Sequence, residues 1–329
     1  MTTAKMLTGL VALAVFTGCG LFGEGDGKRA DQIQPGAGGT AGPGGTGGAS
    51  GGVGGTGGTA ANAGASGTCV GLPGPAMVEV ATPKGVKYCI DRTEVTQAQY
   101  QEFLAQPKTT PGAEHEHCKF NKTYDPVQQP SSLEYASCIV GQSWTPQDTP
   151  NRPVVCIDWC DAFAYCSWAG KRLCGKVGGG PGTILAKVND PADPASDADQ
   201  SQWYNACSQG GKTLFPYGDQ YDAQACEGAD VSVSADGGFL PKKDVGARAG
   251  CRGSTAPFSD IRDLSGSVTE MTDECRWWQD SSPAGGSWQC ALRGGGRSPQ
   301  EQLSCKDYGP DIREWFDMGT GFRCCKDLP

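Results

Sequence analysis

The chain has 329 residues and a formal net charge of −9, with 17 cysteines and only two histidines. An acidic chain repels nucleic acid, so a nucleic-acid partner is excluded. No window of about 18 apolar residues exists, which excludes a transmembrane helix. So many cysteines argue against a reducing compartment, and so few histidines leave little room for histidine-based chemistry.

Residues 1–19 predict an export signal. Lys5 supplies the positive charge, and the apolar core from Met6 to Phe16 is too short to span a bilayer. Small residues precede Cys19, an arrangement that resembles a bacterial lipoprotein cleavage site. The resemblance implies a lipid on Cys19 and an extracytoplasmic place in the cell envelope, at the outer membrane or the cell surface. The alternative is an ordinary cleaved signal peptide with an incidental cysteine.

Residues 20–68 predict a Gly-rich disordered linker. Twenty of these 49 residues are glycine, and no charged residue occurs from Gly36 to Thr68. Such a segment cannot bury enough apolar surface to offset its ordering entropy. A Gly-rich coil of this length has an r.m.s. span of roughly 40 Å. We expect this linker to be a flexible tether that holds a domain away from a membrane.

Residues 69–329 predict one domain that depends on cross-links. No second Gly-, Pro- and Ser-rich break interrupts it. It holds sixteen cysteines, an even number once Cys19 is assigned to lipid, so eight disulfides are possible. This density of cysteines is typical of secreted domains.

Three helices are predicted in this domain from their end signals. The first begins after Thr96, which can form a capping box with Gln99. The second runs over residues 158–169 and stops at Gly170. The third lies near residues 201–208. Elsewhere Gly, Pro, Asp and Ser interrupt the apolar runs, which predicts short strands and long loops.

Six blocks of the domain form a recognisable set. They read KYCIDRTEVT at 87–96, PVVCIDWCDAFAYCSWAGKRL at 153–173, FPYG at 215–218, DLSGSVTE at 263–270, RGGG at 293–296 and GFR at 321–323. In this order the blocks resemble those of the formylglycine-generating enzyme, or sulfatase-modifying factor, family. The resemblance implies that family's C-type-lectin-like α+β fold, with little regular structure. It also implies a family activity, the oxidation of a sulfatase cysteine to formylglycine.

The cysteine pair that binds copper in this family is not matched here. Counted forward from RGGG, the two thiols would fall on Pro299 and Ser304. Counted back from GFR, Cys305 matches a structural cysteine of the family instead. Copper(I) needs soft thiolate ligands, so we expect no copper, no catalytic residue and no oxidase activity. Iron is not expected either, because His115 and His117 are too few ligands and are interpreted as exposed loop residues.

The resemblance implies two disulfides, one between Cys166 and Cys324 and one between Cys207 and Cys305. Cys325 competes for Cys166, so this choice stays open. Each bridge closes a long loop and is expected to contribute about 3–5 kcal/mol. Two further pairs are suggested by proximity alone, Cys226–Cys251 and Cys275–Cys290.

The block at residues 263–270 suggests a metal site. Asp263 and Glu270 place carboxylates on both sides of a Gly-containing turn, and hard oxygen ligands suit Ca²⁺. The resemblance implies one calcium, held by these two side chains and by the carbonyl oxygens of Gly266 and Val268. The alternative is a solvated acidic turn. The family's second calcium is not expected, because Cys226 stands near the place of its Asn ligand.

Two functions stay open for the domain. One is a binding or structural role without the oxidase thiols, and the other is a formylglycine-generating oxidoreductase with a rearranged active site. A second free thiol within reach of Cys305 would favour the oxidoreductase. Trp277, Trp278 and Trp288 could form a platform for a carbohydrate or protein ligand, or they could be buried in the core.

Overall fold

The structure is a computed structural model. It describes residues 69–126, 138, 143–185, 190–234, 240–279 and 286–329. The predicted signal with its lipidated Cys19, and the predicted linker of residues 20–68, lie outside the described residues. No helix in the described ranges is long and apolar enough to cross a membrane.

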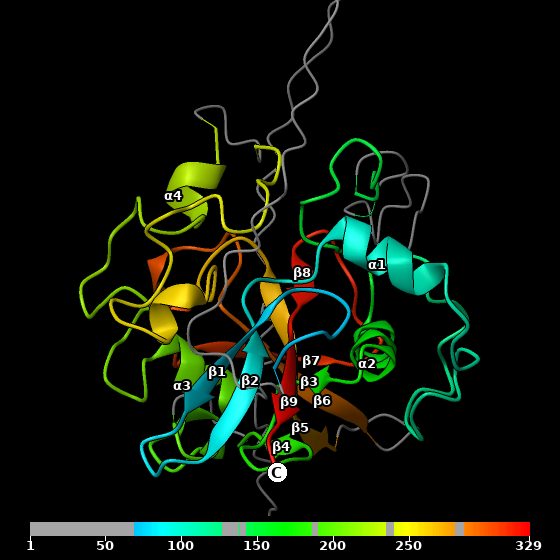
Figure 1. Cartoon of the computed structure of the whole chain (residues 1–329), viewed down its shortest axis with the longest axis horizontal. Coiled ribbons are helices and arrows are strands. Elements are labelled where there is room, and N and C mark those ends of the chain that lie inside the picture. Colours follow the sequence, from blue (N-terminus) through cyan, green and yellow to red (C-terminus); the bar gives the residue numbers. More distant parts are fainter. Residues whose placement is uncertain (1–68, 127–137, 139–142, 186–189, 235–239, 280–285) are drawn as a thin grey trace, which may run out of the picture. The chain divides into compact units, whose positions relative to one another are not determined.

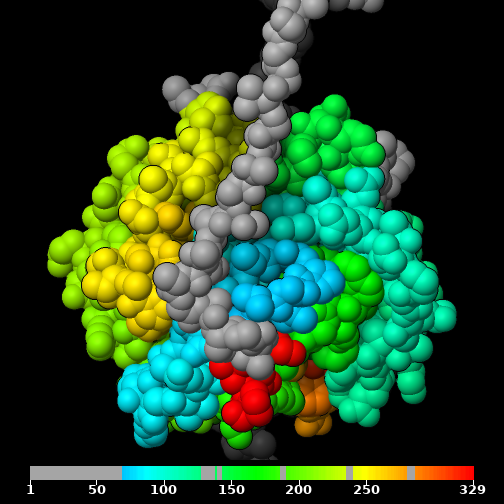
Figure 2. Space-filling view, in the orientation of Figure 1, coloured from blue at the N-terminus to red at the C-terminus, as the bar shows by residue number. Residues whose placement is uncertain are grey.

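The first sheet joins the two ends of the domain. Its four strands are all antiparallel and lie in the order β1 (Met77–Ala81), β2 (Lys87–Asp91), β9 (Cys324–Asp327) and β3 (Arg172–Leu173). Figure 2 shows the blue start and the red end of the domain side by side on its surface. The pairing of β2 with β9 therefore joins two segments that lie far apart in the sequence.

The second sheet mixes parallel and antiparallel pairs (Figure 1). Its main path is β4 (Gly182–Thr183), β5 (Thr269–Trp278), β6 (Ser287–Arg293) and β7 (Tyr308–Ile312). Strand β8 (Thr320–Phe322) adds to β5 in parallel. The register of β5 against β6 shifts between Met271 and Cys275. At this irregularity the Thr272 carbonyl accepts the indole N–H of Trp159 at 2.9 Å.

The three predicted helices are present, and each has a capping side chain. Helix α1 (Gln97–Leu104) and helix α2 (Trp159–Trp168) both begin with a complete capping box. Helix α3 (Gln202–Cys207) begins after Ser201, whose hydroxyl accepts from the Tyr204 N–H. The remaining helical segments are short, namely α4 (Ala229–Ser232), η1 (Pro194–Ser196), η2 (Phe258–Asp260) and η3 (Gln300–Gln302).

An aromatic cluster joins the first two helices to the second sheet. Tyr100 of α1 stacks on Tyr165 of α2 with ring centroids 5.7 Å apart. Phe322 of β8 meets both rings edge-on. Burial of several large rings in contact supplies much of the apolar stabilisation of this region. The predicted α+β fold, with small sheets, few helices and long irregular segments, is confirmed.

All sixteen cysteines of residues 69–329 are bonded to one another. The two pairs implied by the resemblance, Cys166–Cys324 and Cys207–Cys305, are both present. Cys325, the competitor for Cys166, pairs with Cys174 of the neighbouring segment. The remaining pairs are Cys69–Cys89, Cys118–Cys160, Cys138–Cys156, Cys226–Cys251 and Cys275–Cys290.

Candidate functional site

The turn of residues 263–270, which the sequence suggests as a calcium site, is held from two sides. The Gly266 N–H donates to the Gly294 carbonyl at 2.8 Å, and the Ser267 N–H donates to the Glu227 carbonyl at 3.0 Å. Gly266 has a positive φ of 78°, and a Cβ there would lie 2.7 Å from the Glu227 backbone. Only glycine therefore fits this turn without a shift of the backbone.

Glu270 forms a buried ion pair at the end of this turn. Arg323 donates to its two carboxylate oxygens at 2.7 Å and 2.6 Å. The Trp203 indole adds a third hydrogen bond at 2.8 Å. Glu270 and Arg323 are both buried. The guanidinium of the GFR block therefore compensates the charge of this carboxylate.

Two further carboxyl groups near Arg323 are less well compensated. Asp263 is buried and accepts one hydrogen bond, from the Gly246 N–H. Burial raises the pKa of Asp263 to about 6. Glu94 is completely buried, and neither of its carboxylate oxygens has a hydrogen-bond partner. Burial, and then the nearby Asp263 carboxylate, raises the pKa of Glu94 well above its usual range.

These residues form what we call the carboxylate cluster, which consists of Glu94, Asp263, Glu270 and Arg323. It contains three carboxyl groups and one guanidinium, so its acidic charge exceeds its basic charge by two when all are ionised. An unpartnered buried carboxylate is costly unless a cation or a proton neutralises it. A set of hard oxygen donors with excess negative charge fits Ca²⁺.

The positions expected for the catalytic thiols carry no free sulfur. Pro299 and Ser304 occupy them, and the nearby Cys305 is bonded to Cys207. The last residue of the RGGG block, Gly296, has no room for a side chain. A Cβ at this position would lie 2.9 Å from the Thr269 hydroxyl oxygen. Glycine is thus required here by the close approach of the turn.

Two neighbouring cavities lie beside this turn. One of about 320 Å³ is lined by Thr269 and Gly295 among others, and the other has a volume of about 410 Å³. Both are lined by Lys242, Arg297 and Met318. The hollow beside the RGGG block is therefore lined by basic side chains.

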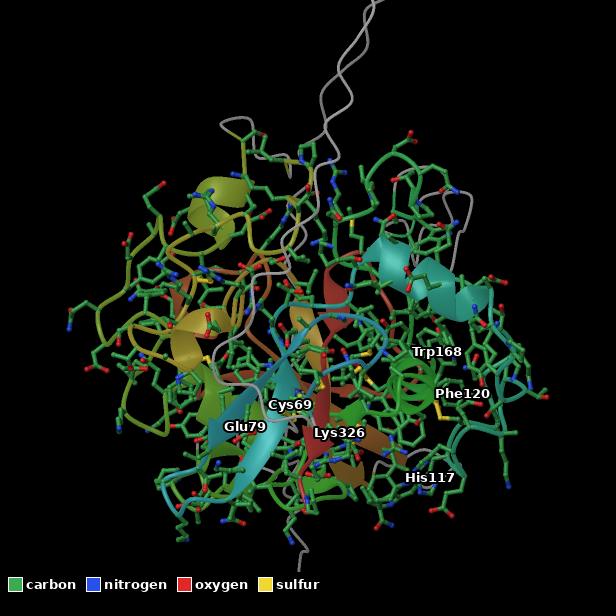
Figure 3. The ribbon with its side chains drawn as sticks, in the orientation of Figure 1. Cys69, Glu79, His117, Phe120, Trp168 and Lys326 are labelled. Atoms are coloured by element: carbon green, nitrogen blue, oxygen red, sulfur yellow. A yellow bond between two sulfur atoms is a disulfide. The ribbon has the colours of Figure 1, made fainter. Side chains whose placement is uncertain are left out.

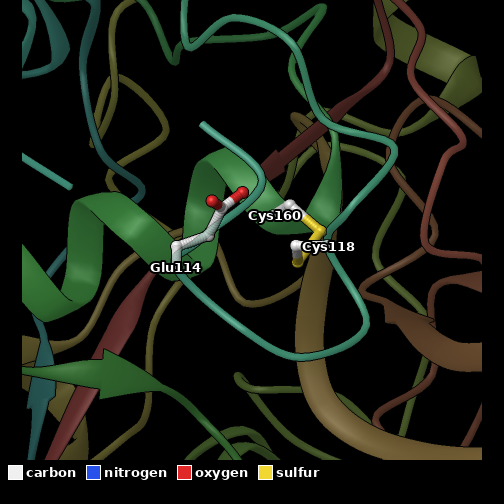
Figure 4. Close-up of side chains that lie close together, drawn as sticks. All are labelled: Glu114, Cys118 and Cys160. Carbon is white, nitrogen blue, oxygen red and sulfur yellow. A yellow bond between two sulfur atoms is a disulfide. The ribbon is translucent and has the colours of Figure 1, made fainter. Parts of the chain in front are cut away.

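A second group with metal-ligating residue types lies between α2 and the loop before it. Glu114, Cys118 and Cys160 bring one ligand atom each within 4.8 Å of one another. The two sulfurs are joined in a disulfide, however (Figure 4). A disulfide sulfur is not a thiolate, which is the form that binds metals. This group is therefore a cross-link beside a carboxylate.

The two histidines are less exposed than the sequence analysis expects, whereas two of the three tryptophans are exposed. His117, on the segment that follows α1 (Figure 3), is only partly exposed, and its ring lies 5.0 Å from that of Trp288. His115 packs edge-on against aromatic rings of α2. The interpretation of exposed loop histidines was therefore wrong. Trp277 and Trp278 belong to β5, and their exposed fractions of 50% and 41% contradict burial in the core.

Residues 80–328 match the family described as Sulfatase-modifying factor enzyme 1-like domain. The chain belongs to this family. The formylglycine-generating enzyme of Mus musculus is 23% identical over 223 residues, which are 57% of this chain and 50% of that protein. Its counterpart in Bos taurus is 24% identical over 204 residues, which are 54% of this chain and 45% of that protein. The chain spans about half the length of the curated relatives it matches.

Among solved structures, PvdO from Pseudomonas aeruginosa is similar to this sulfatase-modifying factor domain. It has a TM-score of 0.43 and 18% identity, and the match covers 77% of this chain and 91% of that chain.

Sequence reasoning found Asp263, Gly266 and Glu270 but missed two residues around them. Glu94 lies in the quoted KYCIDRTEVT block, yet nothing in its spacing links it to a turn about 170 residues later. Lys242 lies in no quoted block. Its only sequence signal is a pair of adjacent lysines, which by itself favours a solvated surface.

Proposed function

We propose that this chain is a membrane-anchored extracytoplasmic lipoprotein whose sulfatase-modifying factor domain acts in binding or structure and lacks the oxidase thiols. One observation carries the proposal. Every cysteine of residues 69–329 is in a disulfide, including Cys305, which alone lies near the expected thiol positions. A bonded sulfur cannot act as a thiolate ligand for copper.

An oxidase assay tests this proposal against the rearranged oxidoreductase. The full chain is incubated with copper(I), oxygen, a reductant and a peptide that contains a sulfatase-type cysteine. We expect no conversion of the cysteine to formylglycine by mass spectrometry. An authentic formylglycine-generating enzyme, assayed in parallel, shows that the peptide and the copper are competent. Turnover by this chain would support the oxidoreductase and overturn the proposal.

The anchor is proposed from Cys19 and its preceding small residues. The many disulfides support an extracytoplasmic location, because such bonds persist in oxidising compartments. Replacing Cys19 by Ala is expected to move the protein from the membrane fraction to the soluble fraction, because the lipid would be its membrane anchor. Sedimentation of the variant with membranes after a salt wash would contradict the anchor.

We also propose that one calcium ion stabilises the domain at the carboxylate cluster. Asp263, Glu270 and the carbonyl oxygens of Gly266 and Val268 would hold it, with Glu94 as an additional carboxylate. The unpartnered Glu94 supports this assignment, since its buried charge calls for a cation. The ion would neutralise the cluster and brace the turn. Metal analysis of the purified protein tests it directly.

The binding role calls for a ligand, and we propose that the exposed indoles of Trp277 and Trp278 contact a carbohydrate or a protein. Their exposure supports this, because rigid aromatic rings provide stacking area at little entropic cost. The Arg276 guanidinium lies 4.8 Å from the Trp278 ring and adds a polar edge. Replacing both tryptophans by Ala is expected to abolish retention on a matching glycan or protein surface. Unchanged retention would rule out a binding role for Trp277 and Trp278.

A further inference from the structure

The two cavities described above lie between segments that are far apart in sequence. The larger one is lined by Gln97 of α1, by Leu240 and by Met318, which precedes β8. The walls are thus drawn from three separate parts of the chain.

Lys242 is the first notable feature of these cavities. It is partly buried, and its Nζ donates to the Ser267 carbonyl at 3.1 Å. Among the described residues no carboxylate forms an ion pair with it. Its neighbour Lys243 is exposed. The Lys242 ammonium group has lost part of its hydration and forms no ion pair with the described residues. It therefore favours binding of an anion.

Arg297 is the second feature, and it is fixed in place. Its Nη2 donates to a Glu227 carboxylate oxygen at 2.6 Å, and its Nη1 donates to the Leu240 carbonyl. Its Nε is buried and has no hydrogen-bond partner. The guanidinium is therefore held rigidly beside Lys242, and its Nε–H remains unused. Two basic groups that line the same cavities make a site for an oxygen anion.

The other walls limit what kind of anion fits. Pro153, Val155 and Met318 provide apolar surface next to the basic groups. Asp148 lines the larger cavity together with Arg152, and Asp317 lines the other. Because Glu227 already pairs with Arg297, the acidic groups offset much of the basic charge and disfavour a ligand of high negative charge. A single carboxylate with an apolar tail satisfies both conditions, whereas a phosphate dianion does not.

We propose that the cavities lined by Lys242 and Arg297 bind a small monocarboxylic acid, with its carboxylate at the two basic groups and its apolar tail along Val155 and Met318. The inference rests on the proposed function, since it supplies a ligand for a domain that binds rather than oxidises. The site is separate from the exposed indoles of β5. It is also separate from the disulfides on which the loss of oxidase chemistry rests.

Calorimetric titration of the full chain with hexanoate tests the proposal. Hexanoate is expected to bind saturably, whereas hexanol and inorganic phosphate are expected to bind at least tenfold more weakly. Lys242→Met is expected to weaken hexanoate binding at least tenfold, because it removes the charge and keeps the length. Lys243→Met, the matched control at an exposed position, is expected to leave the affinity within twofold.

A charge-preserving variant guards against a folding artefact. Lys242→Arg is expected to keep hexanoate affinity within about fivefold, whereas general damage at this position would lower it as far as Lys242→Met does. Absence of saturable hexanoate binding, equal binding of hexanol or phosphate, or unchanged affinity in Lys242→Met would overturn the site. The oxidase assay above does not use this cavity, so a failure here is distinguishable from a failure of the proposed function.

Discussion

Arg323 donates two hydrogen bonds of 2.7 Å and 2.6 Å to the carboxylate of Glu270 in the interior of the domain. The arginine comes from the GFR block near the end of the chain, and the glutamate comes from the turn at residues 263–270. Arg323 also donates to the carbonyls of Asp91 and Arg262. One guanidinium thus ties the end of the turn at residues 263–270 to the first sheet.

Loss of this guanidinium should be strongly destabilising. Arg323→Met would leave the Glu270 carboxylate buried without its cation, and breaking such a pair costs about 3–5 kcal/mol. Chemical denaturation of the purified variant measures the change in the free energy of unfolding. Lys87→Met, which breaks the pair of the exposed Lys87 with Glu79, is the control and is expected to cost at most about 1 kcal/mol. Equal costs for the two variants would contradict the role given to Arg323.

Calcium should raise the melting temperature of the domain. An ion that binds only the folded state adds about 2.7 kcal/mol at a hundredfold excess over its Kd. The wild type is therefore expected to melt higher in millimolar calcium than in chelator, as suits an extracellular site. Asp263→Asn, Glu270→Gln and Glu94→Gln should each lose most of this difference.

Glu102→Gln is the matched control for calcium, because Glu102 is an exposed acid on α1. It should retain the full calcium effect. A wild type that melts identically in calcium and chelator, and that contains no calcium by metal analysis, would rule out the site. Loss of the effect in Glu102→Gln as well would point to non-specific binding.

The stability of the calcium-free protein should fall as pH rises from about 4 to about 7. The pKa of Asp263 is raised from 3.8 to about 6 by burial, so the folded state favours its protonated form. Stability from this group is thus present below its unfolded pKa and is lost as pH rises through the folded pKa. The shift corresponds to on the order of 3 kcal/mol.

Unfolding in chelator at several pH values, for the wild type and Asp263→Asn, measures this effect. The variant should lose less stability over the window, because its amide does not ionise. Subtracting the two curves removes the contribution of other buried acids such as Asp273, whose pKa burial also raises. Parallel curves for the two proteins would disprove the contribution of Asp263.

The disulfides should differ in what they contribute. Cys207–Cys305 has a sequence separation of 98, against 15 for Cys275–Cys290. Cys166–Cys324 is not suited to this comparison, because Cys174–Cys325 closes almost the same loop. Chain entropy predicts a loss of about 4 kcal/mol when Cys207 and Cys305 are replaced by alanines and about 3 kcal/mol for Cys275 and Cys290. Denaturant unfolding of the two double variants gives the comparison. A greater loss for the short-loop pair would contradict the entropic account.

The sequence predicts the helices of this domain better than its cavities. Thr96, Asp158 and Ser201 are cap residues, and caps act on backbone groups two or three residues away, so local sequence contains the signal. The fold class and the two long-loop disulfides were predictable through the family blocks. None of these predictions required knowledge of which distant segments meet.

The features that the sequence analysis missed all depend on contacts between segments that are far apart in the sequence. Glu94 becomes unusual only because Asp263 and Glu270 are brought close to it in the interior. Lys242 becomes unusual only because, in the part of the chain that the structure describes, no carboxylate forms an ion pair with it beside Arg297. The choice between exposed and buried tryptophans stayed open, because residue type does not show which strand end projects into solvent. Tertiary contacts, rather than residue type, decide these roles.

The most direct test of the central claim is a count of free thiols. The full chain is denatured without reduction, treated with iodoacetamide and weighed by mass spectrometry, with a reduced sample as the control for labelling. We predict no added label on residues 69–329 in the unreduced sample and sixteen in the reduced one, because all of these cysteines are paired. One or more labels in the unreduced sample, above all on Cys305, would contradict the account and would support the oxidoreductase with a rearranged active site.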